Sequence, residues 1–555
     1  MAAAERSLRA AVSRTLVSTT AEAGDESDTT TRDVLTEPLH SPFLAPLLAL
    51  PGTWREVADR IERTNLRAVV ESLVEVVHPA AEQSTPLAAD PADDLPSQRR
   101  RLAETAQRLV FADSSAVQGD FLPTKALVNL VSAHRTEAPI EIVVGAKGSG
   151  KTFTYLRMCD SHTWEEFGAR VGVSGVELDA PLVPVLASRN LAGEPTDRVA
   201  EVGRVSASRL SGSAPAPPLA IRELIDDSLG QKLNDAAWRR IWLAGMARAA
   251  GLEATADTAE ERLTDLARDC QAVFVIDGLE DLLQDFSSEP SQQQALRVLL
   301  TNCPEWLRSL RGHPLGLVVF VRRDLVLNAI RQNVQQFLDG YAPSALRWSS
   351  AEALRLAAWV CEGAGVLDDD ASARSADATT LSRLLIRLWG QKLGKVDSRE
   401  ARSEEWVLAA LSDFNLQIQA RDIVSFLSVA AENSVPDTRW NDRLLTPKAI
   451  RDALPKCSSD KVAALGEENH PVGALFDRLT RLPPDVRKIP FTLEAVGLQP
   501  NDARLLEANG VLFREDDQYW IPEIYRYGLG FASSTVGRPR VMSIRDRIRA
   551  SHGSG

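Results

Sequence analysis

The stretch of sequence that decides the fold is a glycine-rich segment that reads Gly145-Ala146-Lys147-Gly148-Ser149-Gly150-Lys151-Thr152. It fits the pattern G-x-x-x-x-G-K-[ST] at every position. The apolar run Ile140 to Val144 before it is typical of a buried strand, and Phe153 to Met158 after it reads as a helix. Glycines let backbone N–H groups converge on an anion, and the helix N-terminus adds the positive end of its dipole. We therefore expect residues 145–152 to bind nucleotide phosphates, with Lys151 on the β- and γ-phosphate oxygens and Thr152 on Mg²⁺.

A second apolar strand, Val273 to Ile276, ends at the carboxylate of Asp277. A hard cation held beside the phosphates needs oxygen ligands, so we expect Asp277 to be the second Mg²⁺ anchor together with Thr152. Hydrolysis also needs a carboxylate that positions or deprotonates the attacking water. Glu280 is the first candidate for this role and Asp281 the second. The alternative is that both acids belong to a solvated turn that caps the next helix.

Two arginines are further candidates for contact with the nucleotide. Arg322 ends the apolar strand Val318 to Val321, and the carboxyl ends of parallel strands meet at one edge of a sheet, so its guanidinium is expected to reach the γ-phosphate. A surface ion pair with Asp324 is the alternative. Arg421 begins a helix farther along the chain and is expected to reach across to the nucleotide, unless it is only a cation on a helix face.

The pattern of strands and helices predicts an α/β fold with a parallel sheet covered on both faces. The expected strands are 140–144, 181–187, 271–276 and 316–321, with helices between them. One of these helices is expected to be long and to run from about residue 219 to residue 250. We divide the chain into a helical region with linkers at 1–110, a nucleotide-binding core at 111–348, a helical lid at 349–435 and a C-terminal domain at 436–555. In the last of these, a helix near 503–508 followed by a hairpin through 510–522 gives the outline of a winged helix.

Composition sets the limits on class and location. The chain has 555 residues, enough for several domains, with 44% hydrophobic and 25% charged residues, as in globular proteins. No apolar run approaches the ~20 residues that cross a bilayer, and the first twenty residues do not resemble a secretory signal, so we expect a cytoplasmic protein without a membrane partner. The five scattered cysteines predict reduced thiols.

The net charge of −13 disfavours non-specific nucleic-acid binding by the body of the protein. The tail is locally basic and offers a nucleic acid or an acidic partner a contact, although a solvated charged end is the simpler interpretation. Its arginines are Arg538, Arg540, Arg545, Arg547 and Arg549. The tryptophans lie in helical apolar patterns and are interpreted as core.

At these motifs the chain resembles the additional-strand class of P-loop ATPases, which includes AAA+, KAP-type and STAND proteins. Asp277-Gly278-Leu279-Glu280-Asp281 is similar to the STAND pattern of a strand, an Asp, a small residue, an apolar residue and two acids. The resemblance implies a sensor role for Arg322 and a helical lid with a winged helix behind it. It covers about residues 138–435.

These observations favour a Mg²⁺-dependent ATPase whose turnover controls a conformational or oligomeric change, with itself or another protein as partner. A P-loop kinase of a small molecule is an alternative, and so is an ATP-binding scaffold or nucleic-acid-associated regulator with little hydrolysis. The biological process is open, and bacterial signalling and defence against phage are among the candidates.

Overall fold

The computed structural model describes residues 94–111, 121–284, 286, 289–367 and 372–533. All of them belong to one compact unit. Most of the region expected to be helical with linkers, residues 1–93, and the arginine-rich tail, residues 534–555, lie outside the described residues. None of the described helices is both long and apolar enough to cross a membrane.

The four expected strands form one parallel sheet, which confirms the α/β prediction. They are β1 (Ile140–Gly145), β2 (Leu182–Leu186), β3 (Ala272–Ile276) and β4 (Leu315–Arg322), in the order β1-β4-β3-β2. Nearly every strand residue is buried, as expected for a sheet covered on both faces. The register places Gly145 opposite Arg322, so the end of β4 lies beside the start of the glycine-rich loop.

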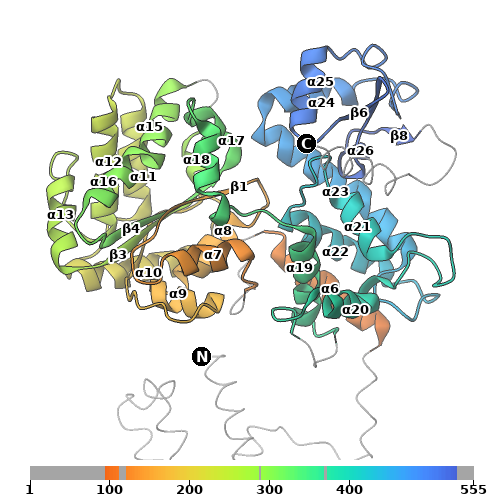
Figure 1. Cartoon of the computed structure of the whole chain (residues 1–555), viewed down its shortest axis with the longest axis horizontal. Helices are drawn as coiled ribbons and strands as arrows, with labels where there is room; N and C mark the ends of the chain where they lie inside the picture. Colours follow the sequence, from red (N-terminus) through yellow and green to blue (C-terminus); the bar gives the residue numbers. More distant parts are fainter. Residues whose placement is uncertain (1–93, 112–120, 285, 287–288, 368–371, 534–555) are drawn as a thin grey trace, which may run out of the picture. The chain divides into compact units, whose positions relative to one another are not determined.

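Helices pack on both faces of the sheet (Figure 1). One face carries α7 (Lys125–Ala133), α8 (Lys151–Cys159), α9 (Trp164–Val171) and α10 (Glu194–Ser211). The other carries α11 (Pro218–Leu229), α12 (Asp235–Ala249), α13 (Ala259–Asp269), α15 (Pro290–Leu300), α16 (Asn302–Ser309), α17 (Arg323–Ala329) and α18 (Val334–Gly340). Successive residues of a strand alternate between the two clusters, because strand side chains have a period of two. The short α14 (Leu279–Leu282) and the 3₁₀ turn η2 (Ala342–Ser344) complete this part.

The stretch 219–250, expected as one long helix, is two helices. α11 ends at Leu229, and α12 begins after Asn234, whose side chain accepts a hydrogen bond from the N–H of Ala237. The side chain at this N-cap position satisfies a backbone donor that a continuous helix would have paired internally.

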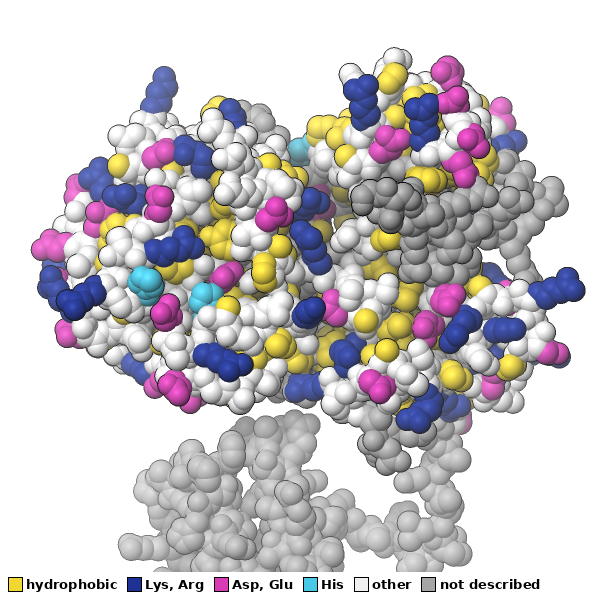
Figure 2. All heavy atoms as spheres, in the orientation of Figure 1, with side chains coloured by type: hydrophobic (Ala, Val, Ile, Leu, Met, Phe, Trp, Pro, Cys, Tyr) yellow, Lys and Arg dark blue, Asp and Glu magenta, His cyan; other side chains and the backbone are white. Residues whose placement is uncertain are grey.

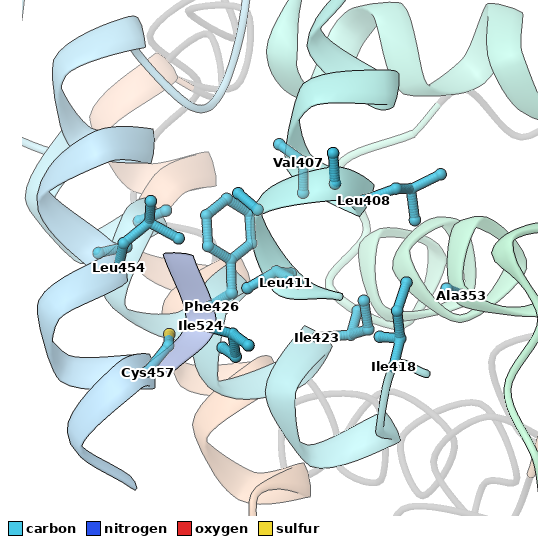
Figure 3. Close-up of a cluster of buried hydrophobic side chains, with 14 of the residues drawn as sticks. Ala353, Val407, Leu408, Leu411, Ile418, Ile423, Phe426, Leu454, Cys457 and Ile524 are labelled. Atoms are coloured by element: carbon cyan, nitrogen blue, oxygen red, sulfur yellow. The ribbon is translucent and has the colours of Figure 1, made fainter. Parts of the chain in front are cut away.

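After the sheet the chain is mainly helical up to residue 480. The helices are α19 (Ser350–Gly363), α20 (Ala378–Trp389), α21 (Ser403–Leu411), α22 (Ala420–Ser434), α23 (Pro447–Glu468) and α24 (His470–Thr480). Figure 3 shows side chains of α19, α21, α22 and α23 converging around Phe426 and Ile423 of α22. The positions of α22 and α23 are therefore coupled through one core. Residues 350–480 are named the helical region below.

The segment after the helical region is a helix followed by a hairpin, as the sequence predicts. It contains β5 (Lys488–Ile489), α25 (Pro500–Ala508), β6 (Phe513–Glu515), β7 (Gln518–Trp520), α26 (Glu523–Arg526) and β8 (Ala532–Ser533). β6 and β7 are antiparallel, and the turn between them places Asp516 and Asp517 at φ of 48° and 60°. Two-residue hairpin turns with both central residues at positive φ match the twist of the strands. The segment shares its hydrophobic cluster with the helical region.

The helix α6 (Leu95–Leu109) packs against α22 and contributes Leu102 and Ala106 to the same cluster. The fully buried guanidinium of Arg99 fixes it there through hydrogen bonds of 2.6–3.1 Å to backbone carbonyls. The acceptors are Ser434, Asp437, Trp440, Arg443 and Leu444. One arginine thus satisfies the carbonyls of the loop between α22 and α23.

Candidate nucleotide site

The glycine-rich loop connects β1 directly to α8, in the strand, loop, helix order that the sequence predicts. Gly148 and Gly150 have φ of 80° and 98°, which only glycine adopts without strain, and Gly150 caps the N-terminus of α8. Ser149 is buried, and its hydroxyl has no hydrogen-bond partner among the described residues. The Ser149 carbonyl accepts a hydrogen bond of 2.9 Å from the indole of Trp348, so a tryptophan interpreted only as core also holds the loop.

Lys151 begins α8 and is largely buried under the loop. Its ammonium donates to the carbonyls of Gly145 and Ala146 at 3.3 and 3.2 Å. These are weak, long contacts that a phosphate oxygen would replace with a charge-assisted hydrogen bond. The lysine is therefore positioned at the loop as the sequence predicts.

Asp277 follows β3 and is completely buried, and its carboxylate makes no well-formed hydrogen bond to the described residues. Burial raises the pKa of Asp277 to about 7, and the charge of Glu280 adds to the effect, whereas a weak contact with the Thr152 hydroxyl, the charge of Lys151 and the N–H of Gly278 oppose it. Burying a carboxylate with so little pairing is costly, and a cation bound beside it would offset that cost. The Asp277 carboxylate and the nearby Thr152 hydroxyl are the hard oxygen donors that Mg²⁺ prefers.

The described residues contain no cluster of three or more His, Cys, Asp or Glu side chains able to hold a metal alone. Mg²⁺ usually combines one or two protein ligands with waters and phosphate oxygens. Gly278 explains how Asp277 fits here: a Cβ on Gly278 would lie 2.6 Å from the backbone of Ser188. In the sequence, Gly278 is recognisable only as the small residue after Asp277.

The two acids after Asp277 lie in different environments. Asp281 accepts hydrogen bonds from the Ser188 hydroxyl at 2.7 Å and from the N–H of Arg189 at 2.8 Å, so it fastens the loop that follows β2. Glu280 and Asp281 both line the cavity at the glycine-rich loop, but the buried Oε2 of Glu280 has no hydrogen-bond partner among the described residues. The two acids thus differ in pairing, since Oδ2 of Asp281 already accepts two hydrogen bonds.

Arg322 is at the end of β4 and forms a two-pronged ion pair with Asp324, with distances of 2.9 and 2.5 Å. Burial lowers its pKa, but the hydrogen bonds and charge of Asp324 outweigh this effect and raise the pKa above the usual value for arginine. Arg322 lines the same cavity as Glu280. To contact a phosphate, its guanidinium would have to exchange some of its bonds with Asp324.

Arg421 contacts the loop through its backbone rather than through its guanidinium. Its N–H donates to the carbonyl of Gly148 at 3.1 Å. Its side chain donates to the carbonyl of Val110 at 3.3 Å and lies over the ring of Phe111. A Cβ on Gly148 would lie 3.1 Å from the Cβ of Arg421, so the glycine permits this close approach of α22.

The helical region makes a second contact with the glycine-rich loop, which no pattern in the sequence predicts. The backbone N–H of Lys147 donates to the carboxylate of Glu468, and the Lys147 ammonium pairs with Glu467. Both acids are at the C-terminal end of α23. More than 300 residues separate them from the loop, and no local pattern marks an acidic helix end as a partner of a distant backbone group.

Most of these residues, although not the fully buried Asp277, line a cavity of about 680 Å³, a size typical of small-molecule sites. Its polar wall includes much of the loop together with Glu280, Asp281, Arg322, Asp324, Arg421 and Glu468. Its apolar wall comes from the end of α6, the segment before α7, and α19 and α22. The apolar side chains of this wall include Leu109, Val110, Phe121, Leu122, Leu356 and Trp359. The combination suits a ligand with an anionic end and a flat apolar end.

No family model matches the chain, and no curated protein matches it. Among solved structures, it is similar to the ORC2 protein of Aeropyrum pernix, which was determined as ADPNP–ADP complexes. The two chains are 12% identical with a TM-score of 0.30, and the alignment covers 77% of this chain and 92% of the other. A likeness this weak establishes neither the fold nor the function of this chain.

On the face seen in Figure 2, basic and acidic side chains of the described residues are interspersed, without a broad area of one sign. Electrostatic capture of nucleic acid needs a concentrated positive surface. This face therefore adds no support for nucleic-acid binding by the described part of the chain.

Proposed function

We propose that the chain is a Mg²⁺-dependent nucleoside triphosphatase that uses ATP to control contacts between its sheet domain and its helical region. The observation that carries this proposal is Asp277, whose fully buried carboxylate makes no well-formed hydrogen bond among the described residues and lies near Thr152 and Lys151. Buried carboxylates are usually hydrogen-bonded. A Mg²⁺–phosphate group between the loop and β3 would pair this one.

Each residue of the site has a role in this proposal. The N–H groups of residues 146–152 and the ammonium of Lys151 bind the phosphates. Thr152 and Asp277 hold Mg²⁺, which when bound neutralises charge on the phosphate oxygens. Glu280 accepts a proton from the attacking water, and Arg322 stabilises charge on the terminal phosphate after leaving Asp324. Hydrolysis is the proposed reaction because the Glu280 carboxylate inside the cavity could accept a proton from an attacking water.

The sheet order supports membership in the additional-strand class of P-loop ATPases. β4 lies between β1, which leads into the loop, and β3, which ends at Asp277, and it is the kind of inserted strand from which the class takes its name. Residues 349–435 then correspond to the lid, and α25 with the β6–β7 hairpin to the winged helix. A STAND-type switch is the finer form of the proposal, because α22 and α23 both contact the loop.

The decisive experiment is Lys151→Ala, with Lys448→Ala as a matched control at an exposed lysine. Loss of the phosphate cation should weaken ATP binding by about tenfold or more, since a charge-assisted hydrogen bond contributes roughly 1.5–3 kcal/mol. The control should bind as the wild type. Isothermal titration with Mg²⁺–ATP measures affinity, and thermal unfolding verifies the fold.

Phosphate release without an added acceptor distinguishes the three functions that the sequence left open. Phosphate release with water as the sole acceptor supports hydrolysis. Formation of ADP that depends on an added acceptor indicates a kinase, and tight ATP binding without formation of phosphate or ADP indicates a scaffold. Unchanged ATP affinity in Lys151→Ala would contradict the assignment of the site.

A further inference from the structure

The glycine-rich loop already holds an anion that belongs to the same chain. The N–H of Lys147, one of the backbone donors of the loop, is directed at the carboxylate of Glu468. Such N–H groups are anion-binding groups, and a carboxylate is chemically equivalent to a phosphate oxygen as an acceptor. Glu468 is thus bound where the motif is built to bind a negative ligand.

The charges around Glu468 match those expected around a terminal phosphate. Burial and the charge of Asp324 raise the pKa of Glu468, while the cations Arg322 and Lys151 lower it. These two cations are the ones assigned to the β- and γ-phosphates. Arg322, Asp324, Glu467 and Glu468 also line one cavity together with the loop.

We propose, on the basis of the proposed function, that the Glu468 carboxylate occupies the position of the terminal phosphate, so that ATP must expel the end of α23 whereas ADP need not. A terminal phosphate and Glu468 would compete for the same N–H group and the same cations. Two anions in that space would also repel each other strongly at low local dielectric. Glu468 therefore discriminates between triphosphate and diphosphate by charge.

The displacement has a defined route into the rest of the helical region. Asn469 ends α23 and begins α24, where its side chain accepts a hydrogen bond of 3.2 Å from the N–H of Val472. Farther back on α23, Lys461 pairs at 2.6 Å with Asp422 in the first turn of α22. Movement of Glu468 is thereby transmitted to the junction of α23 with α24 and to the start of α22.

The test compares Glu468→Gln with Glu432→Gln, an equally conservative change at an exposed glutamate of α22 that does not line the cavity. Affinities for Mg²⁺–ADPNP and Mg²⁺–ADP are measured by titration calorimetry on the full chain. Glu468→Gln should bind ADPNP about tenfold more tightly with ADP affinity nearly unchanged, a coupling of ordinary size for linked ligands. Glu432→Gln should change neither affinity appreciably.

A second measurement avoids dependence on a single variant. In the wild type, hydrogen exchange over residues 461–475 should increase with ADPNP relative to ADP. Equal exchange with the two nucleotides, or an unchanged ratio of ADPNP to ADP affinity in Glu468→Gln, would overturn the inference while leaving nucleotide binding intact. A wild-type chain that binds neither nucleotide would instead refute the proposed function, and this inference with it.

Discussion

The assignment of the proton acceptor gives the sharpest prediction about catalysis, because the structure separates two adjacent acids. Glu280→Gln keeps the shape of the side chain but removes its ability to accept a proton. The buried Oε2 of Glu280 has no hydrogen-bond partner among the described residues, so the change removes no hydrogen bond of that oxygen. We expect turnover to fall by about 10²–10⁴-fold, the usual contribution of general acid–base catalysis, with stability and ATP affinity nearly unchanged.

Asp281→Asn is the companion change and should behave differently. Asp281 accepts two hydrogen bonds, from Ser188 and from the N–H of Arg189, through the same oxygen, Oδ2. Hydrogen bonds to a charged group contribute about 1.5–3 kcal/mol each, and the amide oxygen would retain part of that. We expect a loss of about 1–3 kcal/mol in unfolding free energy, with turnover reduced less than in Glu280→Gln.

The assay measures phosphate release at saturating Mg²⁺–ATP, nucleotide affinity by titration, and unfolding free energy by urea denaturation, for both variants and the wild type. Binding without turnover in Glu280→Gln, together with a destabilised but active Asp281→Asn, would support the assignment. Wild-type turnover by Glu280→Gln would refute it. Loss of turnover confined to a fully stable Asp281→Asn would transfer the role to Asp281.

Two predictions concern stability. Arg99→Ala should lower the unfolding free energy by about 3 kcal/mol or more, because buried carbonyls lose their donor. The control Arg100→Ala, at the exposed neighbouring residue, should change it by less than about 0.5 kcal/mol. Equal effects of the two changes in urea denaturation would contradict the role of Arg99. Burial raises the pKa of Asp413 from 3.8 to about 6, so the folded state holds this proton more tightly. The contribution of Asp413 to the unfolding free energy is therefore greatest below about pH 4 and is lost as the pH rises through about 6. Asp413→Asn should therefore gain up to about 3 kcal/mol over the wild type at pH 8 and much less at pH 4; thermal melts showing the same difference at both pH values would refute this.

The parts of this molecule that the sequence predicts are those set by local pattern. Ile140 to Val144 reads as a buried strand because it is continuous, apolar and β-branched, and the motif after it fixes the glycine conformations. The same logic placed Asp277 at the end of β3. Local pattern also predicted the hairpin near Asp516 and Asp517, although the break between α11 and α12 was missed.

Contacts between distant segments were outside the reach of pattern. Arg421 lines the cavity, so its expected contact with the nucleotide stays a prediction, but no pattern in the sequence indicates that its backbone N–H also contacts the loop. Glu468 carries no local signal, since an acid at a helix C-terminus usually indicates only a solvated residue. The Arg322–Asp324 ion pair was an open alternative, and choosing it required the geometry of the end of β4.

The two contacts that the helical region makes with the loop differ in their response to charge. The bond from the Arg421 N–H to the Gly148 carbonyl involves a backbone acceptor, and a phosphate bound to the N–H groups of the loop does not compete for a carbonyl. The bond from the Lys147 N–H to Glu468 uses the group that the phosphate itself needs. If ATP displaces Glu468, the contact of α22 is therefore retained while that of α23 is lost. The expected motion is a pivot of α23 and the segments after it about the start of α22, rather than the release of the whole helical region from the sheet.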